Sequence, residues 1–281
     1  MITIHAEHPP AAVAENSVRS TDGTRISFRR LGNGPALVLV HGSISTHTDW
    51  MGVAKLLCDR HTCFVMDRRG HARSAAGASP YSIEREAEDI AAVLAVAGPG
   101  AFLAAHPFGA ICAMEAALRH PVPRLALYEP PLPAGGLIAG EYLAPYAAAI
   151  ARGDLDTALE IGLSKFTRLS APVIAAMRAS KAWPRLRTLA STWTRELGAI
   201  DSLPSSLRHY AALTCPILLL RGSLSPEHPL QDASRALAEV LPNARVETLM
   251  GSGHMALRDD PQAVALLIGD FLAEKGTRSI V

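Results

Sequence analysis

His254 is a residue whose type could do acid–base chemistry. It ends the run Gly251–His254, which follows a short segment, Arg245–Leu249, that is typical of a strand. An imidazole exchanges protons near neutral pH, and a carboxylate that accepts a hydrogen bond from one ring nitrogen makes the other nitrogen a better base. The sequence therefore predicts that His254 moves protons if a carboxylate lies beside it.

Two glutamates are candidates for that carboxylate. Glu129 directly follows the apolar run Leu125–Tyr128, so it stands at the carboxyl end of a predicted strand. Glu227 comes after the next apolar run, Ile217–Leu220, and is separated from it by a loop without an acidic residue. Ligands of open α/β sheets bind at the carboxyl ends of the strands, so Glu129 is the favoured partner. Glu227 is the alternative, and a histidine without any carboxylate partner is the third reading.

A proline stands where the chain is expected to turn from a strand into a helix. The letters around it are Ala105-His106-Pro107-Phe108-Gly109. A pyrrolidine ring has no hydroxyl, thiol or carboxylate, so Pro107 cannot form a covalent enzyme intermediate. Proline also holds φ near about −65°, which suits an ordinary helix start and not a strained elbow.

These residues need a frame of alternating strands and helices to bring them together. Short buried runs alternate with amphipathic stretches, which is the pattern of parallel strands covered on both faces. The expected strands are Ala36–His41, Cys63–Asp67, Ala101–His106, Leu125–Tyr128, Ile217–Leu220 and Arg245–Leu249. The expected helices are Tyr81–Ala97 with Ser82 as N-cap, Phe108–His120, Gln231–Val240 and Pro261–Lys275. The predicted fold class is α/β, with a doubly wound, mostly parallel sheet.

The remaining segments complete the predicted domain organisation. Residues 1–16 lack periodicity and are interpreted as an N-terminal arm or an added edge segment, and Asp22-Gly23 marks a hairpin between two short strands. Residues 131–213 have helical periodicity and no convincing strand, which indicates an inserted helical cap. The core is expected to consist of residues 17–130 and 214–281.

Three motifs, in order along the chain, resemble signatures of the α/β-hydrolase superfamily. His41-Gly42-Ser43 resembles the HG turn of that family, and Gly251–His254 is similar to the stretch that delivers its catalytic histidine. Asp67–Ser74 resembles the D-x-R-G-x-G-x-S turn, although Ala72 replaces a family glycine. The resemblance covers the chain from about Ser17 onward. It implies the α/β-hydrolase fold of the small capped bacterial type, with Pro107 at the nucleophile position.

The resemblance also implies how the remaining site residues would act. Backbone N–H groups near Gly42, Ser43 and Phe108 would stabilise a developing oxyanion. Members of the superfamily use a His–carboxylate pair without a nucleophile for isomerisation, elimination, cyclisation or cofactor-free oxygenation. We therefore expect a general acid/base enzyme that acts on a small, apolar metabolite. The alternatives are an ester or lactone hydrolase in which His254 activates water, and a catalytically silent ligand-binding protein.

Four further side chains are candidates for the wall of a pocket. They are His41, His106, Trp50 and Trp183, which neighbour the motifs or belong to the predicted cap. Each has a structural alternative, because histidines often hold loops by hydrogen bonds and tryptophans pack wherever a large apolar side chain fits.

The composition narrows the range of partners. The chain has 281 residues, a formal net charge of +1 and 49% hydrophobic residues, so it lacks the basic excess that nucleic-acid or anionic membrane surfaces require. No H-E-x-x-H or paired-cysteine pattern suggests a metal, and no cofactor is expected. The N-terminus shows no leader, and no apolar run is long enough to span a membrane, which predicts a cytoplasmic protein. The expected partner is a small-molecule substrate, and both a monomer and a dimer remain open.

Overall fold

The computed structural model describes residues 13–274, and in this range eight strands form one sheet. The strands are β1 (Ala14–Arg19), β2 (Arg25–Leu31), β3 (Ala36–Val40), β4 (Thr62–Met66), β5 (Phe102–Ala105), β6 (Leu125–Tyr128), β7 (Ile217–Gly222) and β8 (Ala244–Leu249). Their order is β1-β2-β4-β3-β5-β6-β7-β8, with β2 antiparallel to both of its neighbours and all later pairs parallel. The predicted α/β class with a mostly parallel sheet is confirmed.

The first two strands form the predicted hairpin. Arg19 pairs with Arg25, and Gly23 in the connecting turn has φ +81°, a value that glycine adopts without strain. Strand β1 begins at Ala14, so residues 14–16 of the predicted arm or edge segment belong to the edge of the sheet. The earlier part of that predicted arm, residues 1–12, lies outside the described residues.

Ten α-helices occur in the described part of the chain. They are α1 (Met51–Leu57), α2 (Ile83–Ala97), α3 (Phe108–Arg119), α4 (Leu143–Ala151), α5 (Leu155–Ile161), α6 (Ala171–Arg178), α7 (Trp183–Asp201), α8 (Asp232–Val240), α9 (Ala256–Asp259) and α10 (Pro261–Ala273). Short 3₁₀ helices are η1 (His47–Asp49), η2 (Pro133–Gly135), η3 (Gly140–Tyr142) and η5 (Arg208–Ala212), and short π helices are η4 (Gly162–Phe166) and η6 (Glu227–Gln231). As expected, the Ser82 hydroxyl caps α2 by accepting from the Arg85 N–H.

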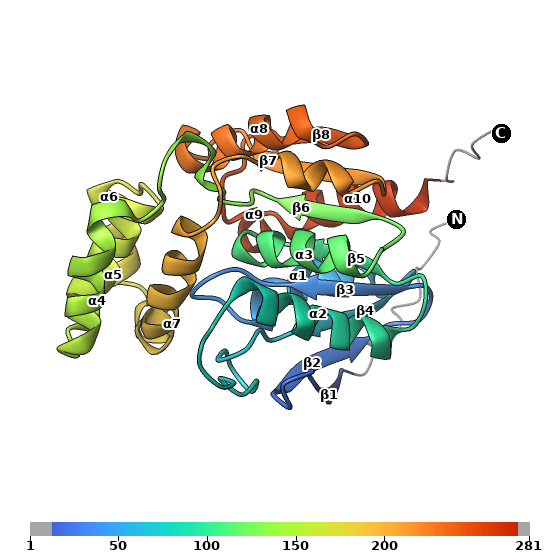
Figure 1. Cartoon of the computed structure of the whole chain (residues 1–281), viewed down its shortest axis with the longest axis horizontal. Helices are drawn as coiled ribbons and strands as arrows, with labels where there is room; N and C mark the ends of the chain where they lie inside the picture. Colours follow the sequence, from blue (N-terminus) through green and yellow to red (C-terminus); the bar gives the residue numbers. More distant parts are fainter. Residues whose placement is uncertain (1–12, 275–281) are drawn as a thin grey trace, which may run out of the picture.

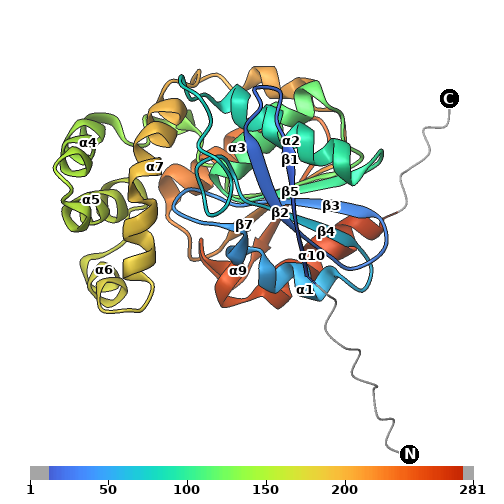
Figure 2. The ribbon, with the colours of Figure 1, turned by 90° about the horizontal axis from the view of Figure 1, so that it is seen from below.

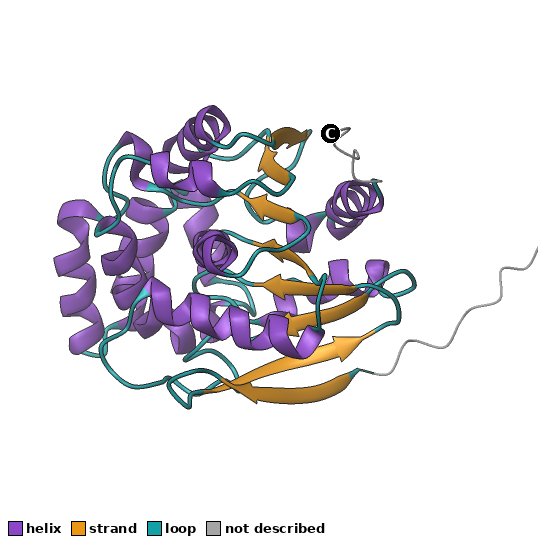
Figure 3. Cartoon of the chain, turned by 45° about the vertical axis from the view of Figure 1, so that its right-hand side comes forward, coloured by secondary structure: helices purple, strands orange, loops and turns teal. Residues whose placement is uncertain are grey.

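Helices cover both faces of the sheet. Helices α2, α3 and α8 pack on one face and share a core with inward residues such as Val38 and Leu103. Helices α1 and α10 pack on the other face against residues such as Leu37 and Leu39. Figure 3 shows the strands as a layer between helices. Successive residues of β3 thus feed two different cores, because side chains of a strand alternate between the faces of a sheet.

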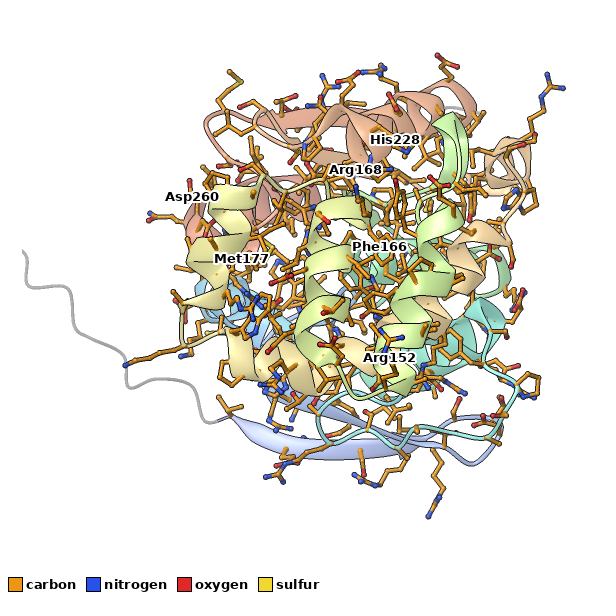
Figure 4. The ribbon with its side chains drawn as sticks, turned by 90° about the vertical axis from the view of Figure 1, so that its left-hand side faces the viewer. Arg152, Phe166, Arg168, Met177, His228 and Asp260 are labelled. Atoms are coloured by element: carbon orange, nitrogen blue, oxygen red, sulfur yellow. The ribbon has the colours of Figure 1, made fainter. Side chains whose placement is uncertain are left out.

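Helices α4–α7, which we call the cap helices, lie between β6 and β7 in the chain and stand together at one end of the sheet (Figures 1 and 2). An aromatic cluster holds them together, in which Tyr146, Phe166 and Trp193 make edge-on contacts at ring-centroid distances of 5.3–6.0 Å. Figure 4 looks onto the cap helices, with Phe166 near the middle of the view. Within residues 13–274, no helix is long and apolar enough to cross a membrane.

Candidate active site

Glu129 lies at the end of β6 and is completely buried. Its backbone has φ +48°, a conformation that is unusual for a residue other than glycine. One carboxylate oxygen, Oε1, accepts a hydrogen bond from the backbone N–H of Gly222 at 2.7 Å. The other, Oε2, lies 2.7 Å from Nδ1 of His254. The strained backbone therefore accompanies a carboxylate with a partner on each oxygen.

His254 stands in the loop between β8 and α9, and neighbouring groups hold this loop in place. The Tyr128 hydroxyl donates to the carbonyl of Gly253 at 2.5 Å, and the N–H of Leu224 donates to the carbonyl of Ser252 at 2.9 Å. Because a carboxylate accepts from Nδ1–H, the lone pair of the neutral imidazole is on Nε2. The arrangement fixes one tautomer and leaves Nε2 as the nitrogen available to a bound molecule.

The structure places Pro107 directly between β5 and α3, with φ −77° and ψ −46°. These angles are those of an ordinary helix start. A Cβ added to Gly42 would lie only 2.1 Å from Cδ of Pro107, so the proline ring packs directly against the Gly42 backbone. No side chain that could attack a substrate occupies this position.

Ser43 and Phe108 line the same cavity as Pro107 and His254, and each has a backbone N–H group that could donate a hydrogen bond. Phe108 is the first residue of α3, where N–H groups have no partner within the helix and the helix dipole is positive. Ser43 precedes Ile44, whose φ is +43°, and no described residue accepts a hydrogen bond from the Ser43 N–H. The arrangement offers two donors to a developing negative charge.

A cavity of about 370 Å³ lies between these residues and the cap helices. Its polar lining comes mainly from the core side and includes Ser43, Ser45, Asp49, His254 and Arg258. Its cap side is almost entirely apolar: Ile138, Leu163, Phe166, Leu169, Val173, Met177, Ala182, Leu186, Trp193, Leu197 and Ile200. Such a volume suits a small organic molecule. Because polar residues line its core side and apolar residues line its cap side, the cavity suits a molecule with one polar end and an apolar body.

Of the two histidines considered for the pocket wall, His106 lines the cavity and His41 does not. The His106 ring stacks between those of Tyr128 and His254, at centroid distances of 4.8 and 4.7 Å. Burial, and then the nearby His254, hold the pKa of His106 well below its usual value. The expectation for His41 is wrong, because its Nε2 accepts from the backbone N–H of Arg68 and its ring is fully buried behind the loop.

The expectations for Trp50 and Trp183 are also wrong. Each indole N–H is engaged away from the cavity, in Trp50 with the Val40 carbonyl at 2.9 Å and in Trp183 with Asp156 at 2.8 Å. Trp193 lines the cavity instead, together with residues that share its face of α7: Leu186, Leu197 and Ile200. Their spacing of three, four or seven residues is helical, so this apolar stripe was readable in the sequence.

The alternative acid, Glu227, makes no hydrogen bond or ion pair with His254 among the described residues. It is exposed and pairs with Arg235 at 2.5 Å.

Ala72, which replaces the glycine of the family turn, has φ +44°. The backbone conformation that favours glycine is therefore present here even with a Cβ.

Asp49 and Arg258 border the cavity without having been singled out by any motif. The Arg258 guanidinium donates to both carboxylate oxygens of Asp49, over 2.7–3.0 Å. The Ser45 hydroxyl donates to the same carboxylate at 2.5 Å. The two residues are 209 positions apart, and no local sequence signal links them.

Comparisons with known proteins show the family and the fold of this chain. Residues 37–266 match the Alpha/beta hydrolase family. The uncharacterized protein Rv2715 of Mycobacterium tuberculosis is 27% identical over 90% of this chain and 80% of its own length. An alpha/beta hydrolase from Sphaerobacter thermophilus is 30% identical in structure-based comparison, with a TM-score of 0.81 over 92% of this chain and all of that one. The esterase RhEst1 from Rhodococcus sp. is 25% identical, with a TM-score of 0.75 over 93% and 99% of the two chains.

Proposed function

Because this chain belongs to the alpha/beta hydrolase family, we propose that it is an enzyme of this family that works without a covalent intermediate, with His254 as general acid/base. The observation that carries the proposal is the 2.7 Å contact between His254 Nδ1 and Glu129 Oε2, beside a proline at the nucleophile position. The dyad supplies a base, and residue 107 supplies no attacking atom. The reaction class is therefore proton transfer to and from a bound substrate.

The proposed chemistry begins with a substrate carbonyl that lies near the Ser43 and Phe108 N–H groups. Nε2 of His254 takes a proton from the substrate, and the electron pair left behind moves onto the carbonyl oxygen. The two N–H groups stabilise the resulting oxyanion, and the Glu129 carboxylate stabilises the imidazolium. Return of the proton to a different atom gives isomerisation or cyclisation, and loss of a leaving group gives elimination. Reaction of the carbanion with oxygen would be the cofactor-free oxygenation.

The lining of the cavity favours a small substrate with an apolar body. In this proposal residues 131–213 act as a cap that encloses it, because the cap helices contribute the apolar part of the lining. Thr167 is the one polar cap residue in that lining, and its hydroxyl already donates to the carbonyl of Leu163 at 2.7 Å. A ceiling made almost entirely of apolar side chains favours alkyl or aromatic substituents.

A second candidate function is hydrolysis of an ester or lactone by water that His254 activates. It is favoured by the similarity to the esterase RhEst1. The same dyad and the same N–H groups would serve, with water as the attacking group and a tetrahedral oxyanion in place of an enolate. The two functions differ in whether the substrate loses a proton from carbon.

The test exposes purified protein to small aryl ketones and to short-chain nitrophenyl esters and enol lactones in D₂O. NMR follows exchange of protons next to the carbonyl, absorbance follows ester cleavage, and mass spectrometry follows any covalent adduct. His254→Ala is the inactive control in each assay. We expect proton exchange that His254→Ala abolishes, without an adduct on the protein.

Other outcomes have definite meanings. Ester or lactone cleavage that requires His254, without carbon–proton exchange, would replace the first function by the second. Binding of these compounds with no turnover of any kind, unchanged in His254→Ala, would show a ligand-binding protein and overturn both.

A further inference from the structure

Arg258 is the only lysine or arginine among the described residues that line the cavity. It lies on α9, four residues after His254, and its side chain is about one-third exposed (34%). The remaining cavity lining is mostly apolar, so this guanidinium is the strongest fixed positive group that a bound molecule would meet.

The orientation of Arg258 is set by the buried Asp49, whose side chain is only 6% exposed. Nε and Nη2 of Arg258 both donate to Asp49, whereas Nη1 has no hydrogen-bond partner among residues 13–274. The Ser45 hydroxyl donates to Oδ2 of the same carboxylate. A guanidinium that is fixed in this way loses little conformational freedom when it binds a ligand, and its planar fork suits a carboxylate.

The charges around Asp49 do not balance within the cluster. Arg185 of α7 approaches the same carboxylate to 3.5 Å, and it also donates to the Thr46 hydroxyl at 2.7 Å. Two guanidinium groups thus share one carboxylate. Neither guanidinium has a second carboxylate within ion-pair distance among the described residues, which favours a negatively charged group on the ligand.

Arg258 is also close to the acid/base pair. It contributes, after burial and His254, to the lowered pKa of His106, the ring that stacks on His254. A molecule in the cavity can therefore meet the dyad with one group and Arg258 with another. We propose that the cavity contains an anion subsite in which Arg258, oriented by Asp49, binds a carboxylate of the substrate.

The inference deepens the proposed function, on which it rests for the identification of the cavity as the substrate site. It narrows the substrate class to small carboxylic acids with an apolar body and a reactive carbonyl. Asp259 also lines the cavity, is exposed and has no cationic partner among the described residues. Its negative charge opposes the subsite, so it supplies a variant with the opposite expected effect.

The test measures binding alone, by calorimetry at low salt, with 4-phenylbutanoate and 4-phenylbutanamide as probes of equal shape. We expect the wild-type protein to bind the carboxylate roughly tenfold or more tightly than the amide, which is the strength of one or two charge-assisted hydrogen bonds. Arg258→Gln should abolish that preference. Asp259→Asn should increase it, because it removes the opposing charge.

A second variant covers the case in which Arg258→Gln does not fold because Asp49 has lost a partner. The double variant Asp49→Asn/Arg258→Gln removes both members of the pair, so neither is left as an unpaired charge, and it should also lose the preference. Equal binding of the two probes by the wild type, no measurable binding of the carboxylate at millimolar concentration, or a preference that survives both variants would overturn the subsite.

The result is independent of turnover. A carboxylate preference that depends on Arg258, in a protein that shows no His254-dependent reaction, would support the subsite and contradict the proposed enzyme. Reaction that depends on His254 with equal binding of the two probes would contradict the subsite alone.

Discussion

At the scale of single residues, the site combines a histidine–carboxylate contact, between His254 and Glu129, with a proline at position 107. Glu129 has both oxygens engaged, by Gly222 and His254, so its carboxylate is held in one orientation. Pro107 sits beside the same cavity with its ring against Gly42. The proposed enzyme thus differs from a covalent hydrolase in the side chain of residue 107, and a substitution at this position tests the difference.

Replacement of Pro107 by serine should create a reactive nucleophile. In Pro107→Ser, a hydroxyl would stand near His254, whose Nε2 can accept its proton. With a fluorophosphonate probe, the serine oxygen would form a bond to phosphorus and fluoride would leave. We expect mass spectrometry to show a single adduct on residue 107 of this variant and none on the wild type. An adduct elsewhere on the wild-type protein would reveal a nucleophile that this site does not contain, and His254→Ala in the serine background should prevent labelling.

Replacement of Glu129 by glutamine should impair the base. The amide can present its N–H to Nδ1 of His254, which would favour the wrong tautomer and place the proton on Nε2. We expect turnover of any substrate found for the protein to fall by roughly 100- to 10,000-fold, with little change in substrate binding. The matched control is Glu227→Gln, which alters an exposed acid on a different loop. Equal effects of the two variants would contradict the role of Glu129.

At the scale of elements, α7 connects the cap helices to the core. Its Glu196 forms a fully buried ion pair with Arg68 at 2.5 Å, and its Arg195 donates to the carbonyl of Arg69 at 2.8 Å. The same helix contributes Trp193 and Leu197 to the cavity wall. One helix thus both builds the apolar wall and fixes it to the turn after β4.

The C-terminal end of α7 is joined to another part of the cavity wall through Asp201. Its carboxylate accepts from the backbone N–H groups of Ile138, Ala139 and Gly140 over 2.7–3.3 Å. Asp201→Ala would leave these N–H groups without an acceptor, and we expect it to lower the free energy of unfolding by about 1–3 kcal/mol. Urea unfolding measures the loss, and Asp201→Asn, which retains one acceptor oxygen, should lose less. An unchanged midpoint in Asp201→Ala would show that water replaces the carboxylate.

At the scale of the whole molecule, the described structure buries several histidines in neutral form. Burial holds the pKa of His41 and His106 well below the ordinary value and lowers that of His71 to about 3. His41 and His71 also contact each other, with ring centroids 5.0 Å apart. In the unfolded chain these imidazoles regain their ordinary pKa, so the unfolded state binds more protons in acid.

Stability should therefore fall as the pH drops below about 6.5 and should continue to fall toward about pH 3. Three neutral histidines that each gain a proton on unfolding give a slope of up to about 4 kcal/mol per pH unit, and stability should be insensitive to these groups above pH 7. Urea titrations at pH 7, 6 and 5 measure the slope, and His71→Gln should reduce it by about 1.4 kcal/mol per pH unit. A constant free energy of unfolding between pH 7 and 5 would contradict this account.

The sequence by itself determined those features that depend on local patterns. Buried runs and amphipathic stretches identified the strands and four of the ten helices in residues 13–274, and the Asp-Gly turn identified the hairpin. Turn chemistry and periodicity act over a few residues, so they are readable in the sequence. The same patterns put Glu129 and His254 after separate strands. Parallel strands end at one edge of a sheet, so their nearness followed from the fold class.

Only the tertiary structure decided which distant side chains meet. It placed Glu129, and not Glu227, against His254 across 125 positions, and it joined Asp49 to Arg258 across 209. It also turned Trp50 and Trp183 away from the cavity and Trp193 toward it. The physical reason is that these contacts depend on how helices pack on the sheet and on each other, and a residue type with its immediate neighbours does not encode that packing.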